Sequence, residues 1–445
     1  GATIQWTTNP LSVQSDVDGN FSIAYREEGG TLTVSSIGFS TQNITVEPGQ
    51  NDLKIIMGLS SGTKINEVVV TALGSQRNTR TLGYSIQQLE GREIQEAKEV
   101  NFINSLQGKL AGVQISGNSG SMGGSAKVTV RGIKSISGDN NALFIVDGVP
   151  MANMNLNTTG QGTGGGGFDF GNPAQLINPN DVDNISVLKG AAATALYGSR
   201  GQNGVIYITT KSGKGSGNLT VNYDFNLQLD QVAVLPKYQN KYGGGNSNEF
   251  GKLYYNDNPE AFNGNGGTYD DNDGKGSYDL IPQYSVDESW GPRLDGQQVR
   301  HYWSWDRDRN NPEFGNTAPW SANPNNVRDF FKTGVTMSNN VSLASGSDKG
   351  SIRFSMGQTT QQYIYPGSNL NRVYFGLNTT YNFTDKLTFS GGINYIMDKS
   401  KGRPGTGFFG PNPMLQFNMY GQRQLDNKRL MDYKYADGSQ QTWNR

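Results

Sequence analysis

The sequence contains no cysteine and a single histidine, His301, among its 445 residues. Disulfides and thiolate metal sites are therefore excluded, as are most metal centres and catalytic triads built on histidine. The chain also offers no clustered acid pair of the kind that general acid–base catalysis uses. We therefore expect that the protein is not an enzyme and that it uses no metal and no cofactor.

Long apolar runs are missing too, because no stretch of about 18 apolar residues occurs, so no transmembrane helix is expected. The net charge of −1 gives no case for nucleic-acid binding. Hydrophobic residues make up only 34%, whereas there are 60 glycines, 21 tyrosines and 19 phenylalanines. This composition favours a mainly β protein with many turns. A β-barrel is compatible with it, because barrel strands alternate and are not hydrophobic on average.

The length indicates two or three parts. Residues 1–60 predict a small β-sandwich that lacks its first strand, with strands at 2–6, 31–34 and 43–46. The turn signal Asp18-Gly19 precedes a further alternating strand, and residues 51–57 close the unit.

Residues 61–80 predict a linker around a short, strongly β-forming stretch, Glu67 to Thr71. The three valines in it do not alternate with polar residues, and polar, flexible segments flank the stretch on both sides. Two interpretations stay open. The stretch is either an internal strand that docks on its own domain, or a short strand that pairs with another sheet edge.

Residues 81–215 predict a mixed α/β block. Phe102, Leu106 and Leu110 share one helical face, so a helix is expected over 101–110. A second helix start is expected at 178–181, and a short helix over 191–197 with a glycine stop at 198. Strands are expected at 113–116, 127–132, 142–146 and 204–211, the third leading into the turn Asp147-Gly148.

The order of motifs in this block resembles the plug of a TonB-dependent outer-membrane transporter, and more narrowly that of the SusC-like transporters of the Bacteroidetes. The resemblance rests on Glu67-Val-Val-Val-Thr-Ala-Leu-Gly, Leu106-Gln-Gly-Lys-Leu-Ala-Gly-Val, Val130-Arg-Gly, Phe144-Ile-Val-Asp-Gly-Val-Pro and Val187-Leu-Lys-Gly-Ala-Ala-Ala-Thr-Ala-Leu-Tyr-Gly. Residues 1–60 resemble the carboxypeptidase-regulatory-like domain that many of these transporters carry. The plug motifs cover roughly residues 67–215.

Residues 216–445 show the alternation of barrel strands, in runs at 219–229, 373–383 and 387–397 joined in part by the turn Thr384-Asp385-Lys386. A soluble sandwich gives the same alternation. The segment from Pro236 to Asp329 predicts a long loop, extracellular in a barrel. We therefore expect the first strands of a transmembrane β-barrel that is incomplete in this chain.

The resemblance implies a set of site residues. Glu67, Val68, Val69, Val70 and Thr71 would be the TonB box. Arg131, Asp147 and Lys189 are plug charges that would either form salt bridges to the barrel wall or act as gate residues. Trp290, Trp303, Trp305 and Trp320 are candidates for stacking on a ligand, with loop packing or an interfacial girdle as the alternative. The acidic run 270–273 leaves a calcium site open.

The function that the resemblance implies is TonB-dependent import of a large ligand, a glycan before a peptide, across the bacterial outer membrane. The plug would be the gate. Expected partners are TonB at the periplasmic face, a SusD-like surface lipoprotein, outer-membrane lipid and a second copy of the two-protein complex. The alternative is a secreted multi-domain β protein that acts in adhesion or glycan binding.

Overall fold

The structure is a computed structural model of residues 1–445. It divides into two compact units, residues 1–88 and 89–445. For 68–70 and 76–78 the backbone alone is described. The described residues are 2–7, 12–16, 18–24, 28–36, 39, 41–50, 52–57, 68–70, 76–78, 86–96, 98–117, 120–136, 139–151, 163–213, 217–306, 308–409, 411–435 and 437–443.

The first unit contains an antiparallel four-stranded sheet in the order β2-β1-β3-β4. Its strands are β1 (Thr3–Trp6), β2 (Ser12–Gln14), β3 (Gly30–Ser35) and β4 (Gln42–Val46). Trp6 and Leu32 are central to its buried core, and Phe21, Ile23 and Leu53 pack against that core as a second layer. Asp16 accepts hydrogen bonds from the backbone N–H groups of Asp18 and Asn20, which confirms the predicted turn.

The segment after this turn is not a regular strand, which corrects the prediction for residues 20–23. Its side chains still reach the core by alternation, but its backbone forms no ladder among the described residues. Farther along the first unit, β5 (Val68–Val70) pairs with β6 (Gln76–Asn78) in an antiparallel hairpin.

The second unit begins with a block that we call the plug block (residues 89–213). Its main sheet has the order β11-β10-β14-β13-β7, in which β10 and β14 run parallel and β13 and β14 antiparallel. The strands are β7 (Ile86–Glu90), β10 (Leu143–Val146), β11 (Val149–Met151), β13 (Val182–Leu188) and β14 (Val205–Thr210), and β8 (Val113–Gly117) forms a separate hairpin with β9 (Ala126–Val130). Helices α1 (Gly91–Gln95) and α3 (Ala191–Tyr197) accompany them.

The strands and the helix α3 confirm the predictions for this block, but two helix predictions are wrong. Residues 101–110 contain a short 3₁₀ helix, η3 (Phe102–Leu106), whose residues Phe102 and Leu106 are fully buried. Asn178 caps only a one-turn 3₁₀ helix, η5 (Pro179–Asp181), because β13 begins at the next residue. Both short elements are capped by asparagine, because Asn101 and Asn178 accept hydrogen bonds from the backbone N–H groups of Ile103 and Asn180.

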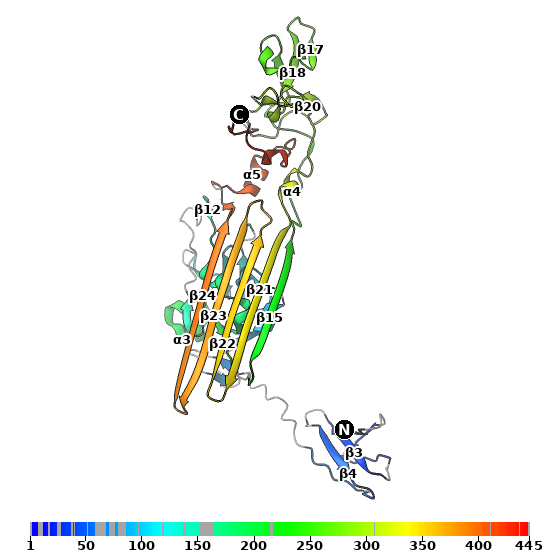
Figure 1. Ribbon diagram of the computed structural model, residues 1–445, viewed down its shortest axis with the longest axis vertical. Coiled ribbons are helices and arrows are strands. Elements are labelled where there is room, and N and C mark those ends of the chain that lie inside the picture. Colours follow the sequence, from blue (N-terminus) through cyan, green and yellow to red (C-terminus); the bar gives the residue numbers. More distant parts are fainter. Residues whose placement is uncertain are drawn as a thin grey trace. The chain divides into compact units, whose positions relative to one another are not determined.

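Five long antiparallel strands follow in the order β15-β21-β22-β23-β24, and we call them the wall sheet (Figure 1). They are β15 (Thr220–Asp230), β21 (Gly334–Ser347), β22 (Gly350–Gln362), β23 (Asn369–Thr384) and β24 (Leu387–Lys401). The runs predicted at 219–229, 373–383 and 387–397 are strands, and β21 and β22 were not predicted. Among the described residues, β15 and β24 are the edges of this sheet, so it does not close.

Between β15 and β21 the chain builds a small loop subdomain instead of an irregular loop. It contains β16 (Gly251–Tyr254), β17 (Tyr269–Asp271), β18 (Gly276–Ile281), β19 (Gln298–Val299), β20 (Ala318–Pro319), η8 (Tyr302–Trp305) and α4 (Asn326–Phe330). Residues after β24 pack on it: Arg423 donates to Asn326 Oδ1 at 2.5 Å and to Asn240 Oδ1 at 3.1 Å.

A short two-stranded sheet joins the plug block to the segment that follows β24. β12 (Gly167–Phe168) of the plug block pairs with β25 (Gly405–Thr406), which follows β24. A short helix, α5 (Pro413–Met419), comes next. Among the described residues, no helix combines the length and the apolar character that crossing a bilayer requires.

Candidate functional site

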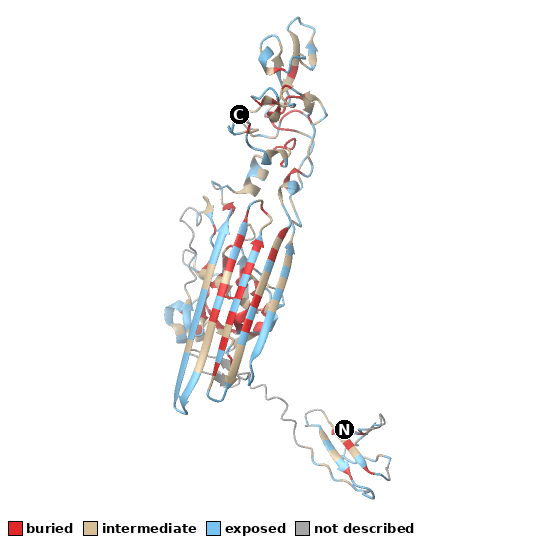
Figure 2. Ribbon diagram, viewed as in Figure 1, coloured by how far each residue is buried: buried red, intermediate tan, exposed pale blue. Residues whose placement is uncertain are grey.

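The two faces of the wall sheet differ in chemistry. Along β22, residues alternate between buried and exposed (Figure 2). Arg353 and Ser355 are buried, whereas Ile352 and Met356 on the opposite face are 51% and 55% exposed. The cross-strand register continues the exposed face from Met356 to Phe375 and Tyr395. One face of the sheet is therefore apolar and exposed, and the other is polar and covered by the plug block.

The main contact between plug block and wall is a buried ion pair. Asp181, at the end of η5, lies 2.7 Å from Arg353 NH1, measured from its Oδ1 atom. Its other oxygen accepts hydrogen bonds from Ser355 Oγ and Asn178 Nδ2, both at 2.9 Å. This carboxylate is therefore held by two wall residues and one plug residue.

The energetics of this pair follow from its burial. Asp181 is 9% exposed and Arg353 5%. Taking both charges out of water costs several kcal/mol, which their attraction offsets only while both are present. Losing either partner would leave a buried, uncompensated charge at about 3–5 kcal/mol. The pair therefore fixes where the plug block sits on the wall.

Two further arginines of the wall segment reach backbone carbonyls of the plug block. Arg372 on β23 donates through Nε and NH2 to one oxygen, Asp398 Oδ2, at 2.8 and 2.5 Å, and through NH1 to Val100 O at 2.8 Å. Arg403, after β24, donates to the carbonyl oxygens of Met122 and Asp169. Lys98 of the plug block lies 3.7 Å from Asp224 on β15, and Asp224 is 40% exposed, so this pair is weaker.

Asp147, one of the predicted gate residues, reaches the wall through one intermediate side chain. It sits in the β10–β11 turn with φ of +47°, and its carboxylate accepts from the backbone N–H and the hydroxyl of Thr210 at 2.9 and 2.6 Å. Thr210 Oγ1 in turn accepts from Asn378 Nδ2 on β23 at 3.1 Å. Asp147 therefore positions Thr210 for the wall contact.

Arg131 and Lys189, the other two predicted gate residues, lie beside each other. Burial lowers the pKa of Lys189, and the Arg131 guanidinium lowers it further. The Lys189 ammonium donates to Ala111 O at 2.5 Å, and Arg131 has a φ of +60°. The ion pairs between plug block and wall described above are formed by Asp181 and Lys98, which the sequence analysis did not single out.

The predicted TonB box falls only partly on described residues. Val68, Val69 and Val70 form the strand β5, whose partner is β6 within the same unit. Glu67 and Thr71 lie outside the described residues. The backbone of the box is therefore seen in an extended form, the conformation that strand addition to a partner requires.

The four tryptophans of the loop subdomain lie in different surroundings. Trp320 is 1% exposed and its indole N–H donates to Pro292 O at 3.1 Å, so it is a core residue and not a surface for ligand stacking. Trp303 is stacked on His301 at 4.2 Å between ring centroids, with Arg429 also over its ring. Trp305 packs against Tyr284. Trp290 is 76% exposed and is the one of the four that stands open to a ligand.

The calcium interpretation of residues 270–273 is not supported. Asp271 lies 2.9 Å from Lys252 Nζ and also accepts from Tyr254, and these bonds lower its pKa to about 2. Within the described residues, no three His, Cys, Asp or Glu side chains gather in a way that could hold a metal ion.

The comparisons with known proteins fit this arrangement. Residues 78–205 match the TonB-dependent Receptor Plug Domain, and residues 1–70 match the CarboxypepD_reg-like domain. TonB-dependent receptor SusC of Bacteroides thetaiotaomicron is 27% identical over 403 residues, which are 90% of this chain and 32% of SusC. The chain is therefore SusC-like and carries the plug domain of a TonB-dependent receptor.

Other relatives share shorter stretches with this SusC-like receptor. TonB-dependent receptor P26 of Formosa agariphila is 32% identical over 53% of this chain and 22% of its own length. The structure of the RagAB peptide importer in its open-open state gives a TM-score of 0.52 at 22% identity, over 75% of this chain and 32% of that one, which shows a shared fold. The chain spans about a third or less of each of these relatives.

This family belongs to the outer membrane of bacteria, and that is the location of this SusC-like receptor. The relatives are receptors and importers by name.

Proposed function

We propose that this SusC-like receptor imports a large ligand across the outer membrane in a TonB-dependent process, with the plug domain as the gate. The observation that carries the proposal is the two-faced wall sheet. Its exposed apolar face suits lipid, and its polar face binds the plug domain through Asp181 and Arg353. A plug domain that is held by polar contacts can move away from the wall sheet, because water can replace each of these contacts.

A pull on the linker has a short path to this ion pair. The linker enters the plug domain at β7, the edge strand beside β13. Gly91, directly after β7, packs so closely on Val182 that a Cβ atom there would lie 2.0 Å from the Val182 carbonyl oxygen. Val182 is the neighbour of Asp181 in the chain. In this proposal TonB binds residues 67–71 by strand addition, and its pull is transmitted through Gly91 to the Asp181–Arg353 pair.

The proposed cargo is a glycan fragment, with a peptide as the alternative. The exposed indole of Trp290 suits the apolar face of a sugar ring. RagAB, which shares the fold, is a peptide importer, and this keeps the alternative open. The proposed partners are TonB in the periplasm and a SusD-like lipoprotein at the surface, in a complex that can pair with a second copy.

The test uses the full-length receptor in its own outer membrane. Deleting residues 67–71 should abolish uptake of labelled oligosaccharides while the amount of receptor at the surface stays unchanged. Deleting residues 61–65 shortens the linker by the same length and should leave uptake intact. Uptake that survives the first deletion would refute the TonB box assignment. Uptake of peptides but not of oligosaccharides would refute the glycan assignment alone.

A further inference from the structure

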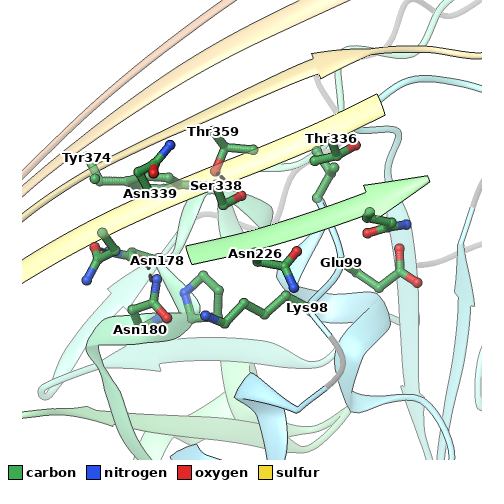
Figure 3. Close-up of a pocket in the computed structure, with 15 residues that line it drawn as sticks. Lys98, Glu99, Asn178, Asn180, Asn226, Thr336, Ser338, Asn339, Thr359 and Tyr374 are labelled. Carbon is green, nitrogen blue, oxygen red and sulfur yellow. Dashed lines mark hydrogen bonds between the residues drawn. The ribbon is translucent and has the colours of Figure 1, made fainter. Parts of the chain in front are cut away.

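A polar cavity of about 30 Å³ lies between the plug domain and the wall sheet (Figure 3). Plug residues Lys98, Glu99, Asn178 and Asn180 line one side of it. Residues of β15, β21, β22 and β23 line the other, among them Asn226, Thr336, Ser338, Asn340, Thr359 and Tyr374. Asn178 joins this cavity to the Asp181–Arg353 ion pair, because it lines the cavity and also donates to Asp181.

Three buried polar atoms on the cavity lining have no protein partner among the described residues. They are Asn180 Oδ1, Thr336 Oγ1 and Asn340 Nδ2. Their residues are 7%, 3% and 3% exposed. Leaving such an atom unpaired costs about 1–3 kcal/mol, so three together at one cavity indicate a bound species that pairs with them.

The orientation of the two amide groups is fixed by their other hydrogen bonds. The backbone N–H of Asn180 donates to Asn178 Oδ1 at 3.1 Å, so Asn178 Nδ2 must be the donor to its other partners. That Nδ2 donates to Asn340 Oδ1 at 3.1 Å. The remaining atom of Asn340 is therefore its NH₂ group, a donor.

The bound species must therefore both donate and accept. Asn340 Nδ2 is a donor, Asn180 Oδ1 is an acceptor, and the Thr336 hydroxyl can be either. A metal cation would require oxygen ligands and would meet the Asn340 NH₂ group and the Lys98 ammonium. An anion would meet the Asn180 oxygen and the Glu99 carboxylate. Water satisfies all three atoms.

The geometry requires more than one water molecule. Thr336 and Asn340 are four residues apart on β21, which is about 13 Å at the rise of a β-strand. A single water bridges groups about 6 Å apart at most, given hydrogen bonds of about 3 Å. Figure 3 shows Thr336 at the opposite side of the cavity from Asn178 and Asn180. The volume of about 30 Å³ matches two waters at about 10–15 Å³ each.

We propose that two ordered water molecules occupy this cavity, one at Asn340 and Asn180 and one at Thr336. Water then adds to the direct contacts between the plug domain and the wall, which include the Asp181–Arg353 ion pair and the Asn178–Asn340 hydrogen bond. Contacts through water are exchanged for contacts with bulk water at little cost. The water-mediated part of this interface therefore opens at a lower cost than the Asp181–Arg353 pair, whose separation in a buried site leaves two uncompensated charges.

The test is a structure of the full-length receptor at a resolution that shows ordered solvent, together with two matched variants. Thr336→Val removes the unpaired hydroxyl. Thr359→Val removes a hydroxyl on the same cavity that already has a protein partner, Ser338 Oγ at 2.9 Å. We expect two waters in the parent protein and in Thr359→Val, and one water, at Asn340, in Thr336→Val.

An empty cavity, or a single ion in it, would overturn the proposal. So would loss of the same water in both variants. A thermal midpoint that rises in Thr336→Val would also overturn it, because removing an unpaired buried hydroxyl stabilises a dry site, whereas removing a hydroxyl that binds water does not.

Discussion

Arg353 of the wall and Asp181 of the plug domain are 2.7 Å apart although 172 residues separate them in the chain, and both are almost fully buried. Arg353→Met should weaken the attachment of the plug domain by about 3–5 kcal/mol, because it leaves the Asp181 carboxylate buried without its cation. Hydrogen exchange of peptides that cover 178–190 measures the change.

The double variant Asp181→Leu with Arg353→Met should be less damaging than the sum of the two single changes, because no buried charge is left. Lys98→Met is the matched control, since its pair with Asp224 spans 3.7 Å and is partly exposed, and should cost about 1 kcal/mol or less. Equal effects of Arg353→Met and Lys98→Met would contradict the assignment of Asp181 as the main attachment point.

Gly91→Ala should displace α1 from β13. The new Cβ atom would lie 2.0 Å from Val182 O, an overlap that only backbone movement can relieve. The cost should be at least about 1–3 kcal/mol, as for other overpacked sites. Gly217→Ala, where no atom lies within 4 Å of the new Cβ, is the control and should be close to neutral. Thermal midpoints of the two purified variants measure these effects.

Acid should destabilise the loop subdomain through His301. Burial lowers the pKa of His301 from 6.5 to about 4, so the folded state binds fewer protons than the unfolded state between these pH values. The contribution of neutral His301 to the free energy of unfolding is then fully present above about pH 6.5. It is lost as the pH falls to about 4, and the loss amounts to about 3 kcal/mol in total.

The urea midpoint of the loop subdomain, followed by tryptophan fluorescence at several pH values, measures this loss. His301 is the only histidine of the chain, and its ring is stacked on Trp303, so the signal is local. His301→Asn should remove the pH dependence over this window. A dependence that persists in that variant would assign the titration to another group.

Trp320→Ala and Trp290→Ala should have opposite consequences for stability and binding. Trp320 is fully buried, so its truncation should destabilise the loop subdomain by about 3–5 kcal/mol. Trp290 is largely exposed, so its truncation should leave stability within about 0.5 kcal/mol and reduce affinity for a stacked sugar. Thermal midpoints and ligand titrations of the two variants form the comparison, and unchanged affinity in Trp290→Ala would remove this residue from the ligand site.

Much of the fold was predictable because its signals are local. The alternation at 219–229 and the helix at 191–197 followed from the periodicity of apolar residues and a glycine stop. Strands β21 and β22 were missed because mostly polar residues occupy their inner face and polar residues, among them Asn339, Gln358 and Thr360, also interrupt the outer one. They form strands because they pair with their neighbours in the sheet, β21 with β15 and β22 with β23.

The site was less predictable, because its contacts join residues far apart in the chain. Asp181 looked like a helix-start residue, and the motif that contains it does form a short cap. Arg353 carried one usable signal, a charge on the polar side of a strand whose other side is apolar. Such a charge needs a buried partner, but the sequence does not say which one. The sequence left Trp320 open between ligand stacking and loop packing, because burial depends on the fold of the whole loop subdomain.

β12 of the plug block pairs with β25 through the backbone, so this contact does not depend on which side chains the two strands carry. Gly167 and Phe168 pair with Thr406 and Gly405, and the backbone N–H of Phe408 donates to Gly164 O at 3.1 Å. These bonds use main-chain atoms, so most substitutions leave them in place. The side chains of Phe168 and Phe408 are 40% and 48% exposed, so they can be exchanged without breaking these bonds. Substitutions at these two rings can therefore alter the surface at this edge while the plug block stays joined to the segment after β24.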